Sequence, residues 1–213
     1  MDNDISLKKG AFFVIEGIDG AGKSSQIKKL EEYISGLGSG YDVIVTKEPT
    51  EESEHGRKIR ESMYKGERFS PEEELLLFTL DRREHLDNLV NPALREGKIV
   101  ICDRYYYSNI AYQGASGLDP EHIRRINEEF ATIPDAVFYL KIGVEGGLHR
   151  IQNVRNSELT SFEKEDFLLQ VSHIFDSMDY DYFHTIDATR TIDDVSRDII
   201  AIVSKILNNR STV

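Results

Sequence analysis

Eight residues near the amino terminus constrain this chain more than any other feature. Gly17 to Ser24 read GIDGAGKS and match the pattern G-x-x-x-x-G-K-[ST]. The apolar run Ala11–Glu16 precedes them and predicts a buried strand, and a helical pattern over Ser24–Leu37 follows them. A glycine-rich turn in this context can fold its backbone N–H groups around a phosphate, next to the positive amino terminus of a helix. The chain is therefore expected to contain a phosphate-binding loop, the P-loop.

The residue types in this loop indicate a nucleoside triphosphate. Lys23 can bridge the β- and γ-phosphates, and the Ser24 hydroxyl can ligate Mg²⁺. An Asn-Lys-x-Asp tetrapeptide, with which switch GTPases read guanine, is absent from the sequence. The predicted phosphate-binding residues are Gly17, Ile18, Asp19, Gly20, Ala21, Gly22, Lys23 and Ser24.

Apolar runs alternate with helical patterns along the rest of the chain, which predicts an α/β fold with a parallel sheet and helices on both faces. The longest helical pattern begins with a capping box at Ser70, has Pro71 at its first position, is disturbed near Pro92 and ends at Gly97. The predicted strands are Ala11–Glu16, Asp42–Thr46, Ile99–Asp103, Ala136–Lys141 and His184–Asp187. The other predicted helices include Ile123–Ala131, Phe162–Phe183 and Ile192–Leu207.

Composition narrows the class further. The 213 residues include 26 Lys and Arg, 38 Asp and Glu and a single cysteine, Cys102, for a formal net charge of −12. We expect one domain over residues 1–213, without a disulfide or a zinc cluster. The sequence shows neither a signal peptide nor an apolar stretch long enough to span a bilayer, so we expect a soluble, cytoplasmic protein with no membrane partner. The acidic balance argues against nucleic acid as a partner.

Two positions after the third predicted strand suggest a second phosphate site. Asp103 ends the run IVICD and is followed at once by Arg104. A carboxylate at the carboxyl end of a strand beside the P-loop can orient hydrated Mg²⁺, and the neighbouring guanidinium can hold the phosphate of a second substrate. The alternative for this pair is a structural ion pair at the strand end.

An aromatic residue and an arginine lie four positions apart on the long helix. Phe78 and Arg82 share one helix face, so the ring can stack on a nucleobase while the guanidinium bonds a base carbonyl. From the residues alone, a core position for Phe78 is favoured, as for its leucine neighbours. The stretch Asp103–Gly114, DRYYYSNIAYQG, adds hydroxyl and amide groups that suit a sugar and a phosphate.

Four segments together carry a family resemblance. GIDGAGKSSQ, KEPT (Lys47 to Thr50), LLLFTLDRREH and DRYYYSNIAYQG occur in this order over about residues 11–187 and resemble thymidylate kinase, which phosphorylates dTMP with ATP. The resemblance implies a nucleoside-monophosphate-kinase-like three-layer sandwich with a five-stranded parallel sheet, ATP as co-substrate, Mg²⁺, and a homodimer. The alternatives are a kinase for another pyrimidine nucleotide such as dUMP and, more remotely, a regulatory P-loop switch.

The resemblance also implies roles for single residues at the two substrates. Asp19 would approach the 3′-hydroxyl of the deoxyribose and help to position the Mg²⁺-bound phosphates. Phe78 would stack on thymine, which reverses the preference for a core position, and Arg82 would bond a thymine carbonyl. Arg104 would hold the dTMP phosphate.

Four further residues would complete the acceptor site by the same resemblance. Glu48 and Pro49 would shape the phosphate side. Asn109 would face the nucleotide, and Tyr112 would crowd the 2′ position of the sugar and disfavour a ribonucleotide.

Members of the family differ in the position of the mobile, positively charged residue that assists the transfer. One group carries Arg directly after the P-loop Asp, whereas another has Gly there and supplies arginines from a lid. Gly20 resembles the second type, so we expect a short lid around residues 149–161 with Arg150 and Arg155 as its cations. Thr160 and Ser161 stand where relatives have Asp-Arg, which removes one expected lid arginine.

Overall fold

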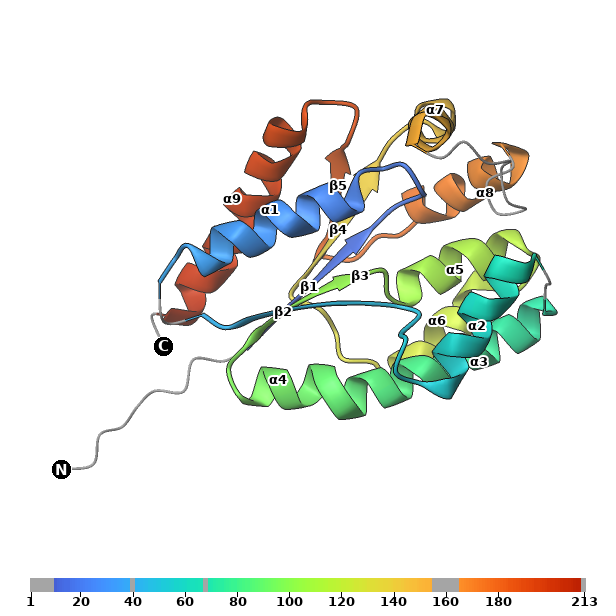
Figure 1. The fold of residues 1–213 in the computed structure, drawn as a ribbon, viewed down its shortest axis with the longest axis horizontal. Helices are drawn as coiled ribbons and strands as arrows, with labels where there is room; N and C mark the ends of the chain where they lie inside the picture. Colours follow the sequence, from blue (N-terminus) through green and yellow to red (C-terminus); the bar gives the residue numbers. More distant parts are fainter. Residues whose placement is uncertain (1–9, 39–40, 67–68, 155–164, 212–213) are drawn as a thin grey trace.

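A parallel sheet of five strands in the order β2-β3-β1-β4-β5 forms the centre of the molecule (Figure 1). The computed structural model describes residues 10–38, 41–66, 69–154 and 165–211. Three strands have the predicted bounds, β2 is shifted by one residue at both ends, and β5 begins one residue earlier than predicted. The strands are β1 (Ala11–Glu16), β2 (Val43–Lys47), β3 (Ile99–Asp103), β4 (Ala136–Lys141) and β5 (Phe183–Asp187).

The order of the strands brings the two predicted phosphate-binding segments together. β1 and β3 are neighbours, with Ile15 paired to Asp103. Because the pair is parallel, the loop after β1 and the loop after β3 leave the sheet at the same edge. All six β1 side chains are buried, which explains the unbroken apolar run of this central strand.

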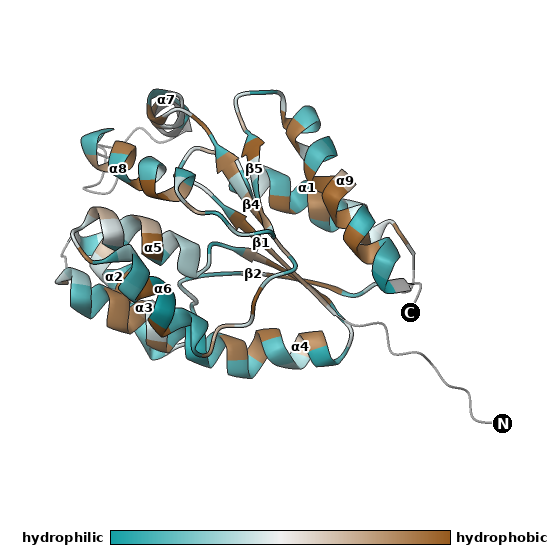
Figure 2. Ribbon diagram, turned by 180° about the vertical axis from the view of Figure 1, so that it is seen from behind, coloured by the Kyte–Doolittle hydropathy of each residue, from teal (hydrophilic) through white to brown (hydrophobic). Residues whose placement is uncertain are grey.

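Helices cover both faces of the sheet, so the predicted three-layer α/β sandwich is confirmed (Figure 1). Helices α1 (Lys23–Ser35) and α9 (Ile192–Ser211) lie on one face, and α3 to α6 lie on the other. The central strands are mostly apolar in Figure 2, whereas the helices carry polar residues outward. The remaining helices are α2 (Glu54–Lys65), α3 (Pro71–His85), α4 (Asn91–Arg95), α5 (Tyr106–Ala115), α6 (Pro120–Glu128), α7 (Val144–Val154) and α8 (Glu165–Asp176).

The long helical pattern from Ser70 folds as predicted at its start and is disturbed before Pro92. The Ser70 hydroxyl accepts from the Glu73 N–H at 3.2 Å, and the Glu73 carboxylate accepts from the Ser70 N–H at 2.9 Å. After α3, the π-helical segment η1 (Leu86–Val90) widens the turn before α4 begins. Proline has no N–H to donate to the preceding turn, so the widened turn accommodates the break and the chain continues in the same direction.

The predicted helices differ from the observed ones in their bounds: α1 ends two residues before the predicted Leu37, and α9 continues four residues beyond the predicted Leu207. The predicted helix Ile123–Ala131 is α6, which begins earlier because the Asp119 side chain accepts from the Glu121 N–H at 3.0 Å. The predicted helix Phe162–Phe183 was too long: α8 ends at Asp176, and Phe183 begins β5. Its first residues, 162–164, lie outside the described residues.

The apolar residues after α8 belong to tertiary packing and not to the helix. Tyr180 and Tyr182 stack on each other with ring centroids 5.4 Å apart, and both rings contact Tyr107 of α5. Within the described ranges, none of the helices combines the length and apolarity that crossing a bilayer requires.

Candidate active site

The P-loop wraps around the side chain of its own lysine. Gly17, Gly20 and Gly22 have φ values of 141°, 79° and 97°, in the region that only glycine adopts readily. Lys23 begins α1 and is buried, and its Nζ donates to the carbonyls of Gly17 at 3.1 Å and Ile18 at 3.2 Å. Burial lowers the pKa of the Lys23 ammonium. A bound phosphate could replace these neutral acceptors with a charged one.

The Asp19 carboxylate contacts both of the cationic side chains that the sequence analysis assigned to different phosphates. Asp19 Oδ1 lies 2.6 Å from Arg104 Nη2 and 3.6 Å from Lys23 Nζ. Lys23 follows β1 and Arg104 follows β3, so the pairing of these strands brings the two side chains together. The fold therefore brings two cations together at the carboxyl ends of these strands.

Arg104 has a left-handed backbone. Its φ is 68°, a conformation that costs a residue other than glycine about 1–3 kcal/mol and persists only where surrounding contacts hold it. Its N–H donates to Ile15 O at 3.0 Å, its Nη1 donates to Ser108 Oγ at 3.1 Å, and its guanidinium lies 5.3 Å from the centre of the Tyr112 ring. Burial raises the pKa of Tyr112 to about 12, so its phenol stays neutral near pH 7.

Asp103 and Ser24 suit a hydrated Mg²⁺ ion. Asp103 Oδ1 is buried and has no hydrogen-bond partner among the described residues, whereas the Ser24 hydroxyl is exposed at the start of α1. In the described part of the chain, no group of three or more His, Cys, Asp or Glu side chains could hold a metal by itself. Mg²⁺ is commonly held by one or two protein oxygens together with substrate phosphates and water, so these residues fit the ion.

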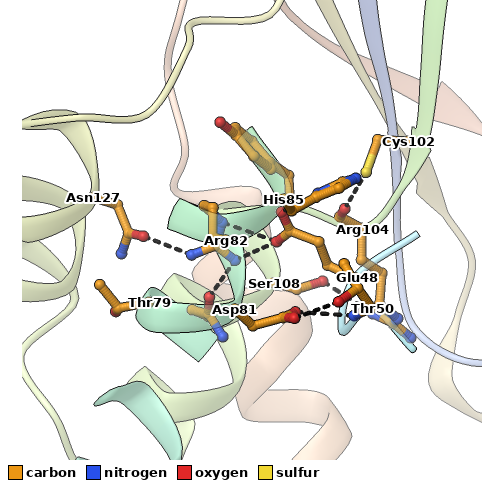
Figure 3. A network of polar contacts seen from close by, with 12 residues as sticks. Glu48, Thr50, Thr79, Asp81, Arg82, His85, Cys102, Arg104, Ser108 and Asn127 are labelled. Carbon is orange, nitrogen blue, oxygen red and sulfur yellow. Dashed lines mark hydrogen bonds and ion pairs between the residues drawn. The ribbon is translucent and has the colours of Figure 1, made fainter. Parts of the chain in front are cut away.

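Arg82, the proposed base-binding arginine, lies in a buried polar network (Figure 3). Its Nε and Nη2 donate to Glu48 Oε2 at 2.8 and 2.6 Å. Its Nη1 donates to Asn127 Oδ1 at 2.6 Å, and its Nη2 also donates to Asn109 Oδ1 at 2.7 Å. These bonds use four of the five guanidinium N–H groups and leave one, on Nη1, for a base carbonyl.

Glu48, which the resemblance assigns to the phosphate side, accepts hydrogen bonds from Arg82, the arginine expected at the base. Its second oxygen lies 3.0 Å from Nδ1 of His85, whose Nε2 is 2.8 Å from Thr46 Oγ1. Because the carboxylate can only accept, Nδ1 carries the proton of this bond. Pro49 follows through a cis peptide bond, and its carbonyl accepts from Arg60.

Phe78 is only half-buried, although it lies one turn from a core residue. Leu75, three positions earlier on α3, is buried in the core. Phe78 does not belong to the buried hydrophobic cluster of the described residues, so its ring is more accessible than the core position that the residues alone favoured would give it. Asn109 is buried within hydrogen-bonding reach of Arg82, and Tyr112 is half-buried beside Arg104.

Of the two predicted lid cations, Arg150 is next to the P-loop. Its Nη1 lies 3.4 Å from Gly20 O, and its Nη2 donates to Ala188 O at 3.1 Å. The predicted lid overlaps α7 as far as Val154, so residues 149–154 are helical, and Arg155 lies outside the described residues.

The comparisons with known proteins identify the family. The family model for thymidylate kinase matches residues 15–199. The chain is 46% identical to the thymidylate kinase of Desulfotalea psychrophila, over 95% of this chain and 98% of that one. It is 44% identical to that of Akkermansia muciniphila, over 95% and 94%, and 40% identical to that of Brachyspira hyodysenteriae, over 93% and 97%.

The chain belongs to the thymidylate kinase family. The resemblance carried by the four sequence segments is thereby confirmed. Against this family background, the structure adds residues that the sequence analysis missed. His85 and Asn127 complete the environment of Arg82, and Gln113 accepts from Asn109 Nδ2 at 3.0 Å.

Only some of these residues left a signal in the sequence. Gln113 lies inside the DRYYYSNIAYQG segment, and His85 lies three positions after Arg82, on the same helix face. Asn127 left none, because α6 reaches Arg82 only through the tertiary fold. Glu16 was also missed, although a carboxylate that ends an otherwise apolar strand is unusual enough to notice.

Proposed function

We propose that the chain transfers the γ-phosphate of ATP to dTMP and produces ADP and dTDP. Family membership supports this reaction. The observation that carries it in the structure is the shared contact of Lys23 and Arg104 with Asp19, at the carboxyl ends of two paired strands. Two cations at this spacing can hold a triphosphate and an acceptor phosphate next to each other.

The transfer requires alignment and charge compensation more than covalent help from the protein. An acceptor phosphate oxygen is largely ionised near neutral pH, so the reaction needs no strong general base. Arg104 holds the acceptor in line with the γ-phosphate, and Lys23 balances charge on the triphosphate. Arg150 and Arg155 are the proposed lid cations for the transferred group. Ser24 and Asp103 would hold Mg²⁺, which would supply further positive charge at the phosphates.

The base and sugar of dTMP bind residues of α3 and α5 in this proposal. Phe78 stacks on thymine, and the remaining N–H of Arg82 Nη1 bonds a base carbonyl. Asn109 presents its amide beside Arg82, and Tyr112 disfavours a 2′-hydroxyl. Asp19 approaches the 3′-hydroxyl, and Pro49 shapes the start of the loop that carries Glu48.

Two further proposals concern the whole protein. We propose a homodimer, supported by exposed apolar side chains on the neighbouring helices α2 and α3, namely Met63, Tyr64 and Leu76. A cytoplasmic location remains a prediction from the sequence.

A coupled assay of ADP release tests the reaction. ATP and Mg²⁺ are supplied with dTMP, dUMP, dCMP or thymidine in turn. We expect strong stimulation by dTMP and weak stimulation by thymidine, because Arg104 requires a phosphate, and the rates with dUMP and dCMP measure how strongly the site selects the base. Preference for dUMP or dCMP would identify a kinase for another pyrimidine nucleotide. No stimulation by any monophosphate would contradict the kinase assignment.

A further inference from the structure

Glu16 is a carboxylate in the core of the sheet that the proposed reaction does not use. It ends β1, directly before the P-loop, and its residue exposure is 0%. An isolated carboxylate at such a position would be strongly destabilising, so its partners decide what it does. Burial raises the pKa of Glu16, and the positive charge of Arg104 opposes this rise.

Among the described residues, the hydrogen-bond partners of Glu16 lie in the segment that carries Arg104. Its Oε1 accepts from the backbone N–H of Tyr105 at 2.8 Å and of Ser108 at 3.1 Å. Its Oε2 accepts from the Ser108 hydroxyl at 2.7 Å. Tyr105 is the residue before α5 and offers no side-chain cap of its own, so Glu16 caps this helix from another strand.

Arg104 is held both at its backbone and at its guanidinium by bonds that involve β1 and Ser108. The peptide N–H that follows Arg104 is bound by Glu16, and the Arg104 N–H is bound by Ile15 O at 3.0 Å, so both peptide groups around its left-handed Cα are held by β1. At the far end, Arg104 Nη1 donates to Ser108 Oγ, whose own proton is directed to Glu16 Oε2.

We infer that Glu16 is a positioning residue for Arg104, which holds the backbone turn and, through Ser108, orients the guanidinium toward the acceptor phosphate. This inference rests on the proposed role of Arg104 and deepens it. Glu16 touches neither substrate. Its bonds hold the Arg104 side chain in the binding orientation before dTMP arrives. Binding of dTMP then does not have to order the arginine, which would cost conformational entropy.

The test compares Glu16→Gln, Ser108→Ala and the double variant with Arg104→Ala and the wild-type protein. Asp135→Asn is the matched control, because Asp135 Oδ2 accepts from the N–H of Phe12, at the other end of the same strand and away from the site. For each protein, KM for dTMP, KM for ATP, kcat, dTMP affinity by calorimetry and the thermal midpoint are measured.

We expect Glu16→Gln to raise KM and Kd for dTMP by about 10- to 100-fold, as misplacement of a substrate-holding group does, while KM for ATP changes by no more than about twofold. Ser108→Ala should act in the same direction, more weakly. The double variant should be no worse than Glu16→Gln, because both changes interrupt one chain of bonds. Asp135→Asn should lower the thermal midpoint without changing either KM.

Two results would overturn the inference and leave the proposed function intact. One is an unchanged KM for dTMP in Glu16→Gln and Ser108→Ala, together with a raised one in Arg104→Ala. The other is an equal rise of both KM values in Glu16→Gln, which would indicate general loosening of the fold. If Glu16→Gln does not fold, Ser108→Ala alone decides between these outcomes. An unchanged KM for dTMP in Arg104→Ala would instead contradict the proposed role of Arg104.

Discussion

The ion pair of Glu48 and Arg82 is shielded from solvent, with side-chain exposures of 2% and 1%. Removing the carboxylate would leave a buried guanidinium without a counter-charge. We expect Glu48→Ala to lower the free energy of unfolding by about 3–5 kcal/mol, as breaking a buried pair does. Glu48→Gln, which keeps one acceptor oxygen for Arg82, should lower it less. Urea denaturation of both variants measures the difference, and a loss below about 1 kcal/mol in Glu48→Ala would contradict the network.

Phe78 offers a second prediction for a single residue, because its two interpretations have different consequences. If Phe78 stacks on thymine, Phe78→Ala should raise the KM for dTMP by about 5- to 150-fold, the equivalent of 1–3 kcal/mol, with little loss of stability. If Phe78 is a core residue, the same substitution should instead lower the free energy of unfolding by about 3–5 kcal/mol. Leu75→Ala on the same helix is the control: it should lower stability and leave KM for dTMP unchanged. Kinetics and urea denaturation on the same samples separate the two.

At this scale, the sequence predicts those site residues whose neighbours are close along the chain. Gly17 to Ser24 form a local motif, so a glycine-rich loop between β1 and α1 could be predicted from spacing alone. The side chains that bond Arg82 belong to Asn109, Glu48 and Asn127, which are 27, 34 and 45 positions away. No local pattern encodes such a pairing, and neither does it encode the left-handed backbone of Arg104, which depends on contacts with β1.

At the scale of elements, α7 packs against the P-loop through two glycines. A Cβ on Gly20 would lie 2.3 Å from Gly147 O, and one on Gly147 would lie 3.0 Å from Asp19 O. A Cβ on the adjacent Gly146 would meet only the Ile142 side chain, at 3.4 Å. The first turn of α7 therefore approaches the loop closely enough to exclude side chains, which gives a physical reason for Gly20 in this chain.

The two adjacent glycines make a matched test of this contact. Gly147→Ala should push α7 away from the P-loop, displace Arg150, and lower kcat/KM for ATP by about tenfold or more. Gly146→Ala should keep normal kinetics and gain up to about 1 kcal/mol from the better helix propensity of alanine. Steady-state kinetics with ATP and thermal unfolding measure both. Equal kinetics in the two variants would show that the contact does not position Arg150.

Elements were predicted well where their ends are encoded locally. The capping box at Ser70 set the start of α3, and the buried runs of β1, β3 and β4 set those strands. The end of α8 was missed because apolar residues continue beyond Asp176. Tyr180 and Tyr182 serve an aromatic cluster around Tyr107, and periodicity alone cannot separate such tertiary contacts from a longer helix.

The whole molecule has a net charge of −12, yet positively charged side chains cluster at the candidate site. Residues 160–198 contain ten acidic and three basic residues, whereas Lys23 and Arg104 meet at the carboxyl edge of the sheet. The local field decides whether a phosphate binds, and net charge acts mainly on solubility and non-specific association.

The proposed homodimer is also a property of the whole molecule, and exposed apolar residues locate its test. Tyr64 and Met63 on α2 are 93% and 45% exposed, and Leu76 on α3 is 58% exposed. A charge buried in a dimer interface without a partner is strongly unfavourable. Leu76→Glu should therefore reduce the mass measured by light scattering from that of a dimer to that of a monomer. Ile192→Glu, at an exposed apolar residue on α9 across the sheet, should leave the mass unchanged. A wild-type protein that is monomeric at micromolar concentration, or a Leu76→Glu variant that is still dimeric, would contradict an interface on α2 and α3.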